Sequence, residues 1–232
     1  MFSTCRLICI IAPLVAAAVA GGTERYSCQA DVFMFESYEK KPVVWSPDHS
    51  KHIRLWGSKE HSNLSIYSTE QLLKTISLWE LSGATFVKWA PDSKAFYVMW
   101  SDGGAIGGYH IRAFLVSDDQ ATESPAPKKV AVEFAQHHYC STRGNNLYAI
   151  RWEDGSNQLL LKAGVYPTSD CGRQMGFAAG YRVNTVSGEI TQQYSAKQVD
   201  DIANNCPSVV FPSAFASQED VDATIKNGKI QK

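Results

Sequence analysis

Short segments of alternating apolar and polar residues, separated by turn residues, run along most of the chain. In 43–57, VVWSPDHSKHIRLWG, such residues flank a Pro-Asp pair, and 87–101, VKWAPDSKAFYVMWS, repeats the arrangement. Proline favours the first central position of a tight turn and aspartate the second. Each stretch therefore predicts a strand, a turn and a second strand, which together form a β-hairpin with one buried face.

Tryptophan, proline and aspartate recur at matching positions of these two hairpins. The repeated turn positions are Trp45, Pro47 and Asp48 in the first hairpin and Trp89, Pro91 and Asp92 in the second. A further tryptophan, Trp56 or Trp100, follows at the same spacing in each hairpin. Because a buried tryptophan contributes mainly a large apolar surface, we expect these residues to pack between sheets rather than to contact a ligand.

A third, weaker copy of the hairpin is predicted in 139–155, YCSTRGNNLYAIRWEDG. In this copy Trp152 aligns with Trp100, and residues 143–146 form the turn. The three copies start at residues 43, 87 and 139. Similarity that recurs at about 40–50 residues is typical of propeller blades and of other repeat folds.

The turn sequences WSPDHSK and WAPDSKA resemble the W-S-P-D-G-K motif of TolB-type β-propeller repeats, where the motif joins the first two strands of a blade. His49 and Ser93 occupy the position of the motif's glycine, and the third copy lacks the Trp-x-Pro-Asp core. The resemblance implies an all-β, propeller-like fold. At about 40–50 residues per blade, residues 21–232 would form about four blades. A β-sandwich built from the same hairpins is the alternative.

Other segments carry strand, loop and helix signals. Further strands are expected in 63–68, 109–116, 129–135, 157–164 and 180–194, the last divided by a turn at Ser187-Gly188. The polar stretch 118–129, which contains prolines, is expected to be a loop. Two short helices are expected near the C-terminus, one after Ser195 with Gln198 at its capping-box position, and one in 217–228.

Residues 1–20 have the layout of a cleaved secretory signal. One positive charge, Arg6, precedes an apolar run that is short for a membrane span and ends in small residues. We therefore expect a signal peptide in 1–20, a β-repeat domain in 21–212 and a C-terminal tail in 213–232. No later apolar run is long enough to span a membrane, so the mature protein is expected to be secreted or periplasmic.

Four cysteines remain after residue 20, and an even number in an exported chain suggests two disulfides. They are Cys28, Cys140, Cys171 and Cys206. The expected strand order places Cys140 and Cys171 at the same end of one sheet, which predicts a bond between them. Cys28 is then left for Cys206, and this second bond would join the two ends of the mature chain.

Charge and motifs argue against several classes of function. The chain has 22 basic and 23 acidic residues and no basic stripe, which argues against a nucleic-acid partner. It contains no G-x-S-x-G, H-E-x-x-H, P-loop or EF-hand motif, and GGAIGG in 103–108 is interpreted as a hairpin loop. The adjacent carboxylates are expected to be surface charges: Asp118-Asp119, Glu153-Asp154 and Asp200-Asp201. No catalytic, cofactor-binding or metal-ligating residue is assigned, and no cofactor is expected.

Two hypotheses of function remain. The first is a non-catalytic, protein-binding or scaffolding protein whose partner is another exported or envelope protein. The second is a small secreted hydrolase or carbohydrate-binding module, with Trp79, Trp152 or Tyr166 as exposed platforms for sugar rings. A pocket that gathers His110, His138 and an acid would favour catalysis, whereas a surface without such a cluster would favour binding.

Overall fold

The computed structural model describes residues 31–33, 41–58, 61–78, 85–101, 108–138, 145–166 and 171–205. Several expectations fall outside these residues and stay predictions: the signal peptide 1–20, the tail 213–232, the helix in 217–228, Trp79, Cys28, Cys140 and Cys206. Among the described residues, no helix is long and apolar enough to cross a membrane.

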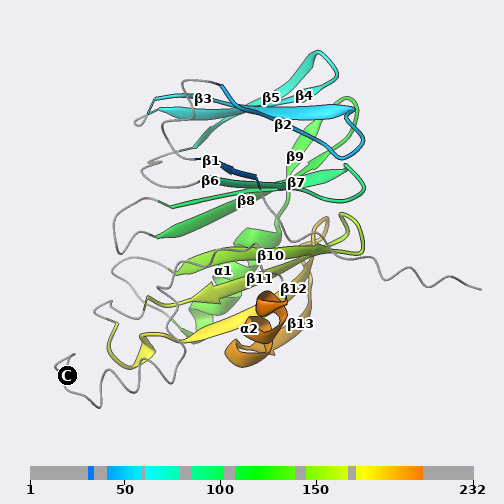
Figure 1. The fold of residues 1–232 in the computed structure, drawn as a ribbon. Coiled ribbons are helices and arrows are strands. Elements are labelled where there is room, and N and C mark those ends of the chain that lie inside the picture. The colour runs from blue at the N-terminus through cyan, green and yellow to red at the C-terminus, as the bar shows by residue number, and fades with distance from the viewer. Residues whose placement is uncertain are drawn as a thin grey trace, which may run out of the picture.

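Three antiparallel sheets are stacked on one another (Figure 1). The first sheet consists of β2 (Val43–Trp45), β3 (Lys51–Gly57), β4 (Ser62–Ser68) and β5 (Gln71–Leu78). The second consists of β6 (Thr85–Trp89), β7 (Ala95–Ser101), β8 (Tyr109–Val116) and β9 (Ala121–Glu123), with β1 (Asp31–Phe33) added beside β6. The third consists of β10 (Asn146–Glu153), β11 (Gln158–Gly164), β12 (Ala178–Asn184) and β13 (Ile190–Ser195), and a 3-10 turn, η2 (Gly172–Gln174), precedes β12.

The described residues are therefore mostly β, as the alternating pattern predicts. They form three stacked sheets instead of the two layers of a β-sandwich. The expected closure of about four blades into a ring is not confirmed by these residues.

The second sheet is the centre of the molecule because it buries both of its faces. Successive side chains of a strand point to opposite faces. On β7, Phe96 and Val98 pack against the first sheet, whereas Tyr97 and Met99 pack against the third. All seven residues of β7 are buried, which explains why AFYVMWS is almost continuously apolar.

A helix that the sequence analysis missed, α1 (Ala126–His137), lies beside the second and third sheets. The expectations of a loop in 118–129 and a strand in 129–135 are wrong there, and β9 also lies in the expected loop. The segment KVAVEFA alternates like a strand, but Val130 and Phe134 are also one helical turn apart, and both are fully buried. Prolines in the first turn favour a helix start, and the alternating Val132 is exposed.

The expected helix after Ser195 is present as α2 (Ala196–Asn204), with the Ser195–Gln198 capping box. α2 covers the outer face of the third sheet, where Val199 and Ala203 pack on two sheet residues, Ile150 and Leu160. This contact requires glycine at position 180 of β12. A Cβ atom there would lie 2.7 Å from Cβ of Val199.

The third hairpin differs from its expected alignment. Trp152 is the second-last residue of β10, the first strand of the third sheet, so it corresponds to Trp45 and Trp89 and not to Trp100. Its turn follows it, at Asp154-Gly155, where both residues have positive φ, 51° and 62°. The amide of Asn157 donates to the carbonyl oxygen of Asp154 at 3.0 Å and closes this four-residue loop. The turn expected in 143–146 is wrong at its last residue, because Asn146 is the first residue of β10.

Candidate functional site

Tryptophans at equivalent positions connect the three sheets. Trp89 is 4% exposed, and its Nε1 donates a hydrogen bond to the carbonyl oxygen of Val44 in the first sheet at 3.3 Å. Trp152 is also 4% exposed, and its Nε1 donates to the carbonyl oxygen of Lys88 in the second sheet at 3.1 Å. Val44 and Lys88 each precede the first-strand tryptophan of their own sheet. Each of these tryptophans therefore binds the same position of the preceding sheet.

The Pro-Asp turns follow these strands. The amide of His49 donates to the carbonyl oxygen of Ser46 at 2.9 Å, and the amide of Ser93 donates to that of Ala90 at 3.0 Å. His49 and Ser93 have φ of 57° and 60°, in the left-handed region. This conformation explains why the W-S-P-D-G-K motif has glycine at this position. Pro47 and Pro91 occupy the first central position of each turn.

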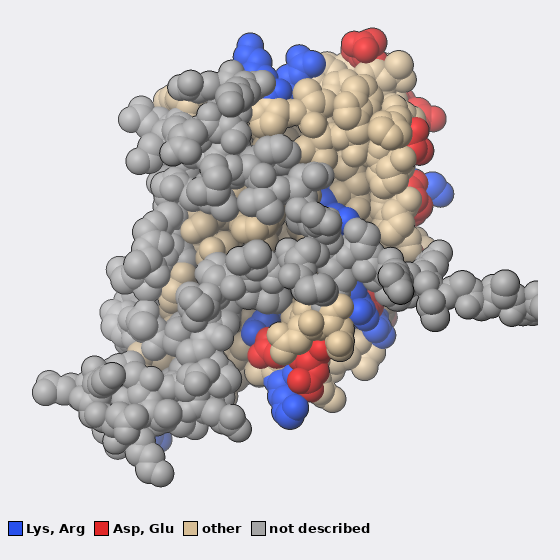
Figure 2. Space-filling view, in the orientation of Figure 1, with Lys and Arg blue, Asp and Glu red and all other residues tan. Residues whose placement is uncertain are grey.

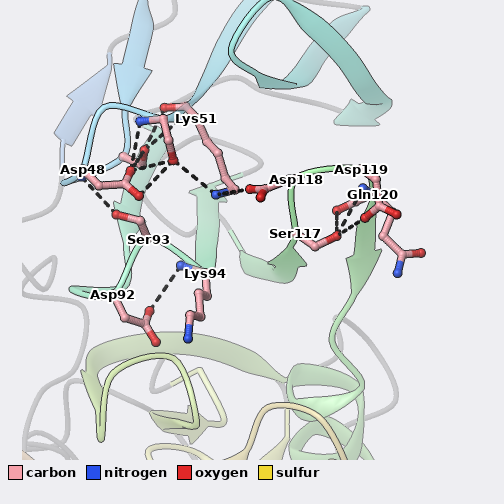
Figure 3. A network of polar contacts seen from close by, with 11 residues as sticks. Asp48, Lys51, Asp92, Ser93, Lys94, Ser117, Asp118, Asp119 and Gln120 are labelled. Atoms are coloured by element: carbon pink, nitrogen blue, oxygen red, sulfur yellow. Dashed lines mark hydrogen bonds and ion pairs between the residues drawn. The ribbon is translucent and has the colours of Figure 1, made fainter.

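The turns of neighbouring sheets also contact one another (Figure 3). The amide of Asp48 donates to Oγ of Ser93 at 3.1 Å. The amide and the hydroxyl of Ser156 donate to Oδ2 of Asp92 at 3.1 Å and 2.8 Å. Hydrogen bonds from the Ser46 hydroxyl and from the backbone of residue 50 hold the pKa of Asp48 well below its usual value. Both turn aspartates therefore have structural roles.

The outer face of the first sheet carries the exposed member of the tryptophan series. Trp45 ends β2 as Trp89 ends β6, but its side chain is 47% exposed because no described sheet precedes it. Other side chains of alternating strand positions share this face with it. We call this set the open face: Val43, Trp45, His52, Arg54, Trp56, Ser65, Tyr67 and Leu72.

Aromatic rings lie side by side on the open face. The Trp45 and His52 rings are 4.6 Å apart, and His52 is stacked on Tyr67 at 4.7 Å with an interplanar angle of 5°. The Arg54 guanidinium lies 5.5 Å from the centre of the Tyr67 ring. Nε1 of Trp56 donates to a serine hydroxyl of β4 at 2.9 Å. Nε1 of Trp45, by contrast, has no hydrogen-bond acceptor among the described residues.

His52 is buried beneath these rings. Burial lowers the pKa of His52, the positive charge of Arg54 lowers it further, and the negative charge of Glu70 opposes them only in part. The imidazole is therefore neutral at pH 7, and its Nδ1 has no partner within the described part of the chain. Arg54 is then the one charged side chain of the open face, which is otherwise aromatic, aliphatic and hydroxylic.

The outer face of the third sheet, at the opposite end of the stack, carries charged side chains. On the outer side of the third sheet, Glu153 accepts hydrogen bonds from Arg182 and from Arg151, the latter at 2.6 Å. Burial raises the pKa of Glu153, but these hydrogen bonds and charges outweigh burial and lower it overall. The expectation that Glu153 is a surface charge is therefore wrong, because it is 7% exposed. Charged side chains also gather around α2 in the space-filling view (Figure 2).

A cavity of about 340 Å³ lies between the second sheet, α1 and the start of β10. Arg112 and Glu123 line it and form a two-point ion pair at 2.8 Å and 2.6 Å, which lowers the pKa of Glu123. His110 lines this cavity, but His138 does not; its Nδ1 lies 3.0 Å from Oε1 of Gln174. The described residues contain no group of three or more His, Cys, Asp or Glu side chains that could hold a metal ion.

Two of the proposed sugar platforms are not exposed. Trp152 is buried between sheets, as described above, and Tyr166 is 5% exposed. Among the described residues, the exposed tryptophans are Trp45 and Trp56, which the repeat pattern had predicted to pack between sheets. Their place in the first copy of the repeat is the signal that marks them, since no sheet among the described residues precedes the first sheet.

Cys171 is disulfide-bonded. Every other cysteine of the chain lies outside the described residues, so the proposed pairing of Cys171 with Cys140 stays a prediction.

No family model matches the chain, and no curated protein sequence matches it. Among solved structures, it is similar to acylaminoacyl peptidase from Pyrococcus horikoshii, with a TM-score of 0.34 and 13% identity, over 62% of this chain and 23% of that one. It is also similar to TolB from Acinetobacter baumannii, with a TM-score of 0.33 and 15% identity, over 77% of this chain and 34% of that one. The chain thus spans about a quarter to a third of these proteins. At TM-scores this low, neither similarity bears on its fold or function.

Proposed function

We propose that this chain is an exported, non-catalytic binding protein that holds another protein on the open face. The observation that carries the proposal is the exposure of Trp45. The equivalent tryptophans of the second and third sheets are buried and hydrogen-bonded to a neighbouring sheet. Trp45 has the same position on its strand, but no sheet among the described residues lies against it.

The exposed apolar side chains of the described residues are concentrated on this face. Four of the seven large apolar side chains that are exposed belong to it: Val43, Trp45, Trp56 and Leu72. A contiguous exposed apolar patch is typical of an interaction site. Tryptophan, tyrosine and arginine, which Trp45, Tyr67 and Arg54 supply, are also the residues that contribute most to protein–protein affinity.

The carboxylates with altered pKa values support a structural role over a catalytic one. Asp48, Glu123 and Glu153 are each held below their usual pKa by hydrogen bonds from neighbouring donors. A general acid that works near neutral pH needs the opposite shift, toward a higher pKa. These carboxylates instead join turns and strands of the sheets.

Site-specific photo-crosslinking in the exporting cell tests the proposal. A photoreactive amino acid is placed at position 45 or at position 72 of the open face. Matched controls carry it at Val186, in the turn after β12, or at Val132 on α1, both of which are exposed. We expect one protein to be captured at both open-face positions and at neither control, and Trp56→Ala to weaken the capture.

Equal capture at all four positions would overturn the proposal, as would no capture at positions 45 and 72. Saturable binding of a purified polysaccharide to the open face, lost on Trp45→Ala, would overturn it in favour of the carbohydrate-binding alternative.

A further inference from the structure

Contacts between successive sheets have a fixed register in this chain. The tryptophan at the end of the first strand donates to the carbonyl oxygen that precedes the tryptophan of the sheet before it. The residue four positions after the tryptophan contacts the turn aspartate of that same preceding sheet. Ser93 accepts a hydrogen bond from the backbone amide of Asp48. Ser156 donates two hydrogen bonds to the carboxylate of Asp92.

The first sheet carries residues at the two positions that contact the preceding sheet in the second and third sheets. Trp45 occupies the donor position, and His49 lies four residues after it, where Ser93 and Ser156 lie in the later sheets. Both side chains are exposed. The apolar residues Val43 and Leu72 lie on the same face, on either side of the aromatic rings.

From this register we propose that the partner docks a β-sheet on the open face, in the place of a sheet that precedes β2–β5. A backbone carbonyl oxygen of the partner's strand accepts the hydrogen bond of Trp45 Nε1, and an acidic residue in its adjoining turn contacts His49. The inference rests on the proposed function and specifies the chemistry of the partner. The acidic turn also suits Arg54, the one charge of the open face.

A second copy of the chain does not fit this register. In a head-to-tail arrangement, the preceding sheet would be the third sheet of another copy. The outer face of that sheet is covered by α2 and by the ion pairs of Glu153 with Arg151 and Arg182. A two-fold arrangement of two open faces would bring two like charges, the Arg54 side chains, into one apolar interface.

The hydrogen bond of Trp45 can be tested without changing the shape of its side chain. Trp45 is replaced by 3-benzothienylalanine, which has sulfur in place of the indole N–H. The probe is the protein captured by the photoreactive residue at position 45 or 72, purified and titrated against each variant. We expect about three- to tenfold weaker binding, the effect of one lost neutral hydrogen bond. The control is Val132→Ala on α1, an exposed position outside the open face, and we expect it to leave affinity unchanged.

The turn contact has its own pair of variants. His49→Ser introduces the residue found at the two equivalent positions, and we expect it to retain binding. We expect His49→Ala to weaken binding, with an unchanged thermal unfolding midpoint relative to His49→Ser, because both put a short side chain at the same backbone conformation.

Mapping of the crosslinked peptides completes the test. Crosslinks from positions 45 and 49 are expected on one antiparallel hairpin of the partner, the second of them in a turn that contains Asp or Glu. Crosslinks to a helix, to a second copy or to another segment of this chain would overturn the docking inference. Capture of one protein at positions 45 and 72, with crosslinks on a helix, leaves the proposed function standing, whereas no capture removes both.

Discussion

Truncation of two equivalent tryptophans, Trp89→Ala and Trp45→Ala, should have very different effects on stability. Both residues end the first strand of a sheet before a Pro-Asp turn. Trp89 lies between the first and second sheets, packed 5.0 Å from the Phe96 ring, and is almost fully buried. About half of the Trp45 side chain is exposed on the open face, at 47%.

The expected magnitudes follow from burial. A tryptophan side chain buries at most about 250 Å², which at about 25 cal/mol per Å² gives an upper bound of about 6 kcal/mol. Large aromatic truncations in cores cost about 3–5 kcal/mol, and we expect this range for Trp89→Ala. The lost hydrogen bond to Val44 contributes about 1 kcal/mol of this. Trp45→Ala removes about half the buried area and leaves no enclosed cavity, so we expect about 1–2 kcal/mol.

Urea unfolding followed by far-ultraviolet circular dichroism measures both losses, because this signal reports mainly on the backbone of the sheets. The free energies can be compared directly if the slope against urea is the same for both variants and the parent. Equal losses for the two variants would refute the reasoning, since they would mean that the open face is covered. A loss below about 1 kcal/mol for Trp89→Ala would refute the assignment of that residue to the core.

Three further changes test other parts of the structure. His49→Gly should raise the free energy of unfolding by up to about 1 kcal/mol, because φ of 57° strains a residue that has a Cβ. Ser93→Gly should raise the free energy of unfolding by less, because it also removes the Oγ that accepts a hydrogen bond from the amide of Asp48. Because burial lowers the pKa of His52 below 6.5, the unfolded chain binds its proton more readily, so stability should fall as the pH drops below 6.5. In His52→Gln, the difference between the thermal unfolding midpoints at pH 7.5 and pH 5.5 should be smaller than in the parent. An unchanged difference would mean that His52 does not cause the pH dependence. Gly180→Ala should displace α2 and lower the free energy of unfolding by about 1–3 kcal/mol. Amide hydrogen exchange should become faster in 196–204 but not in the first sheet. Protection of 196–204 equal to that of the parent would contradict the packing of α2 on Gly180.

The sequence by itself determined the local elements whose signals lie within a few residues of one another. The Trp-x-Pro-Asp stretches specify hairpins because proline and aspartate fit the central positions of a turn, and both hairpins are present. The Ser195–Gln198 pair specifies the start of α2, because both partners of a capping box lie in one turn of helix.

The segment that forms α1 shows where local signals are insufficient. Its residues alternate in hydrophobicity over a short stretch, so a strand and a helix each place apolar side chains on one face. Packing decided between them, because only the helix places both Val130 and Phe134 in the core between the second and third sheets.

The candidate site depended most on tertiary structure. Trp45, Trp89 and Trp152 occupy equivalent places at the ends of three strands, and nothing in the residues around them distinguishes an exposed indole from a buried one. Their exposure depends on whether another sheet lies against the strand, and this is set by segments far away in the chain. Glu153 is buried for the same reason, since Arg182, its partner from another strand, lies 29 residues along the chain. Turn chemistry is local, so sequence specifies it, whereas the surface left open by stacking is a property of the assembled sheets alone.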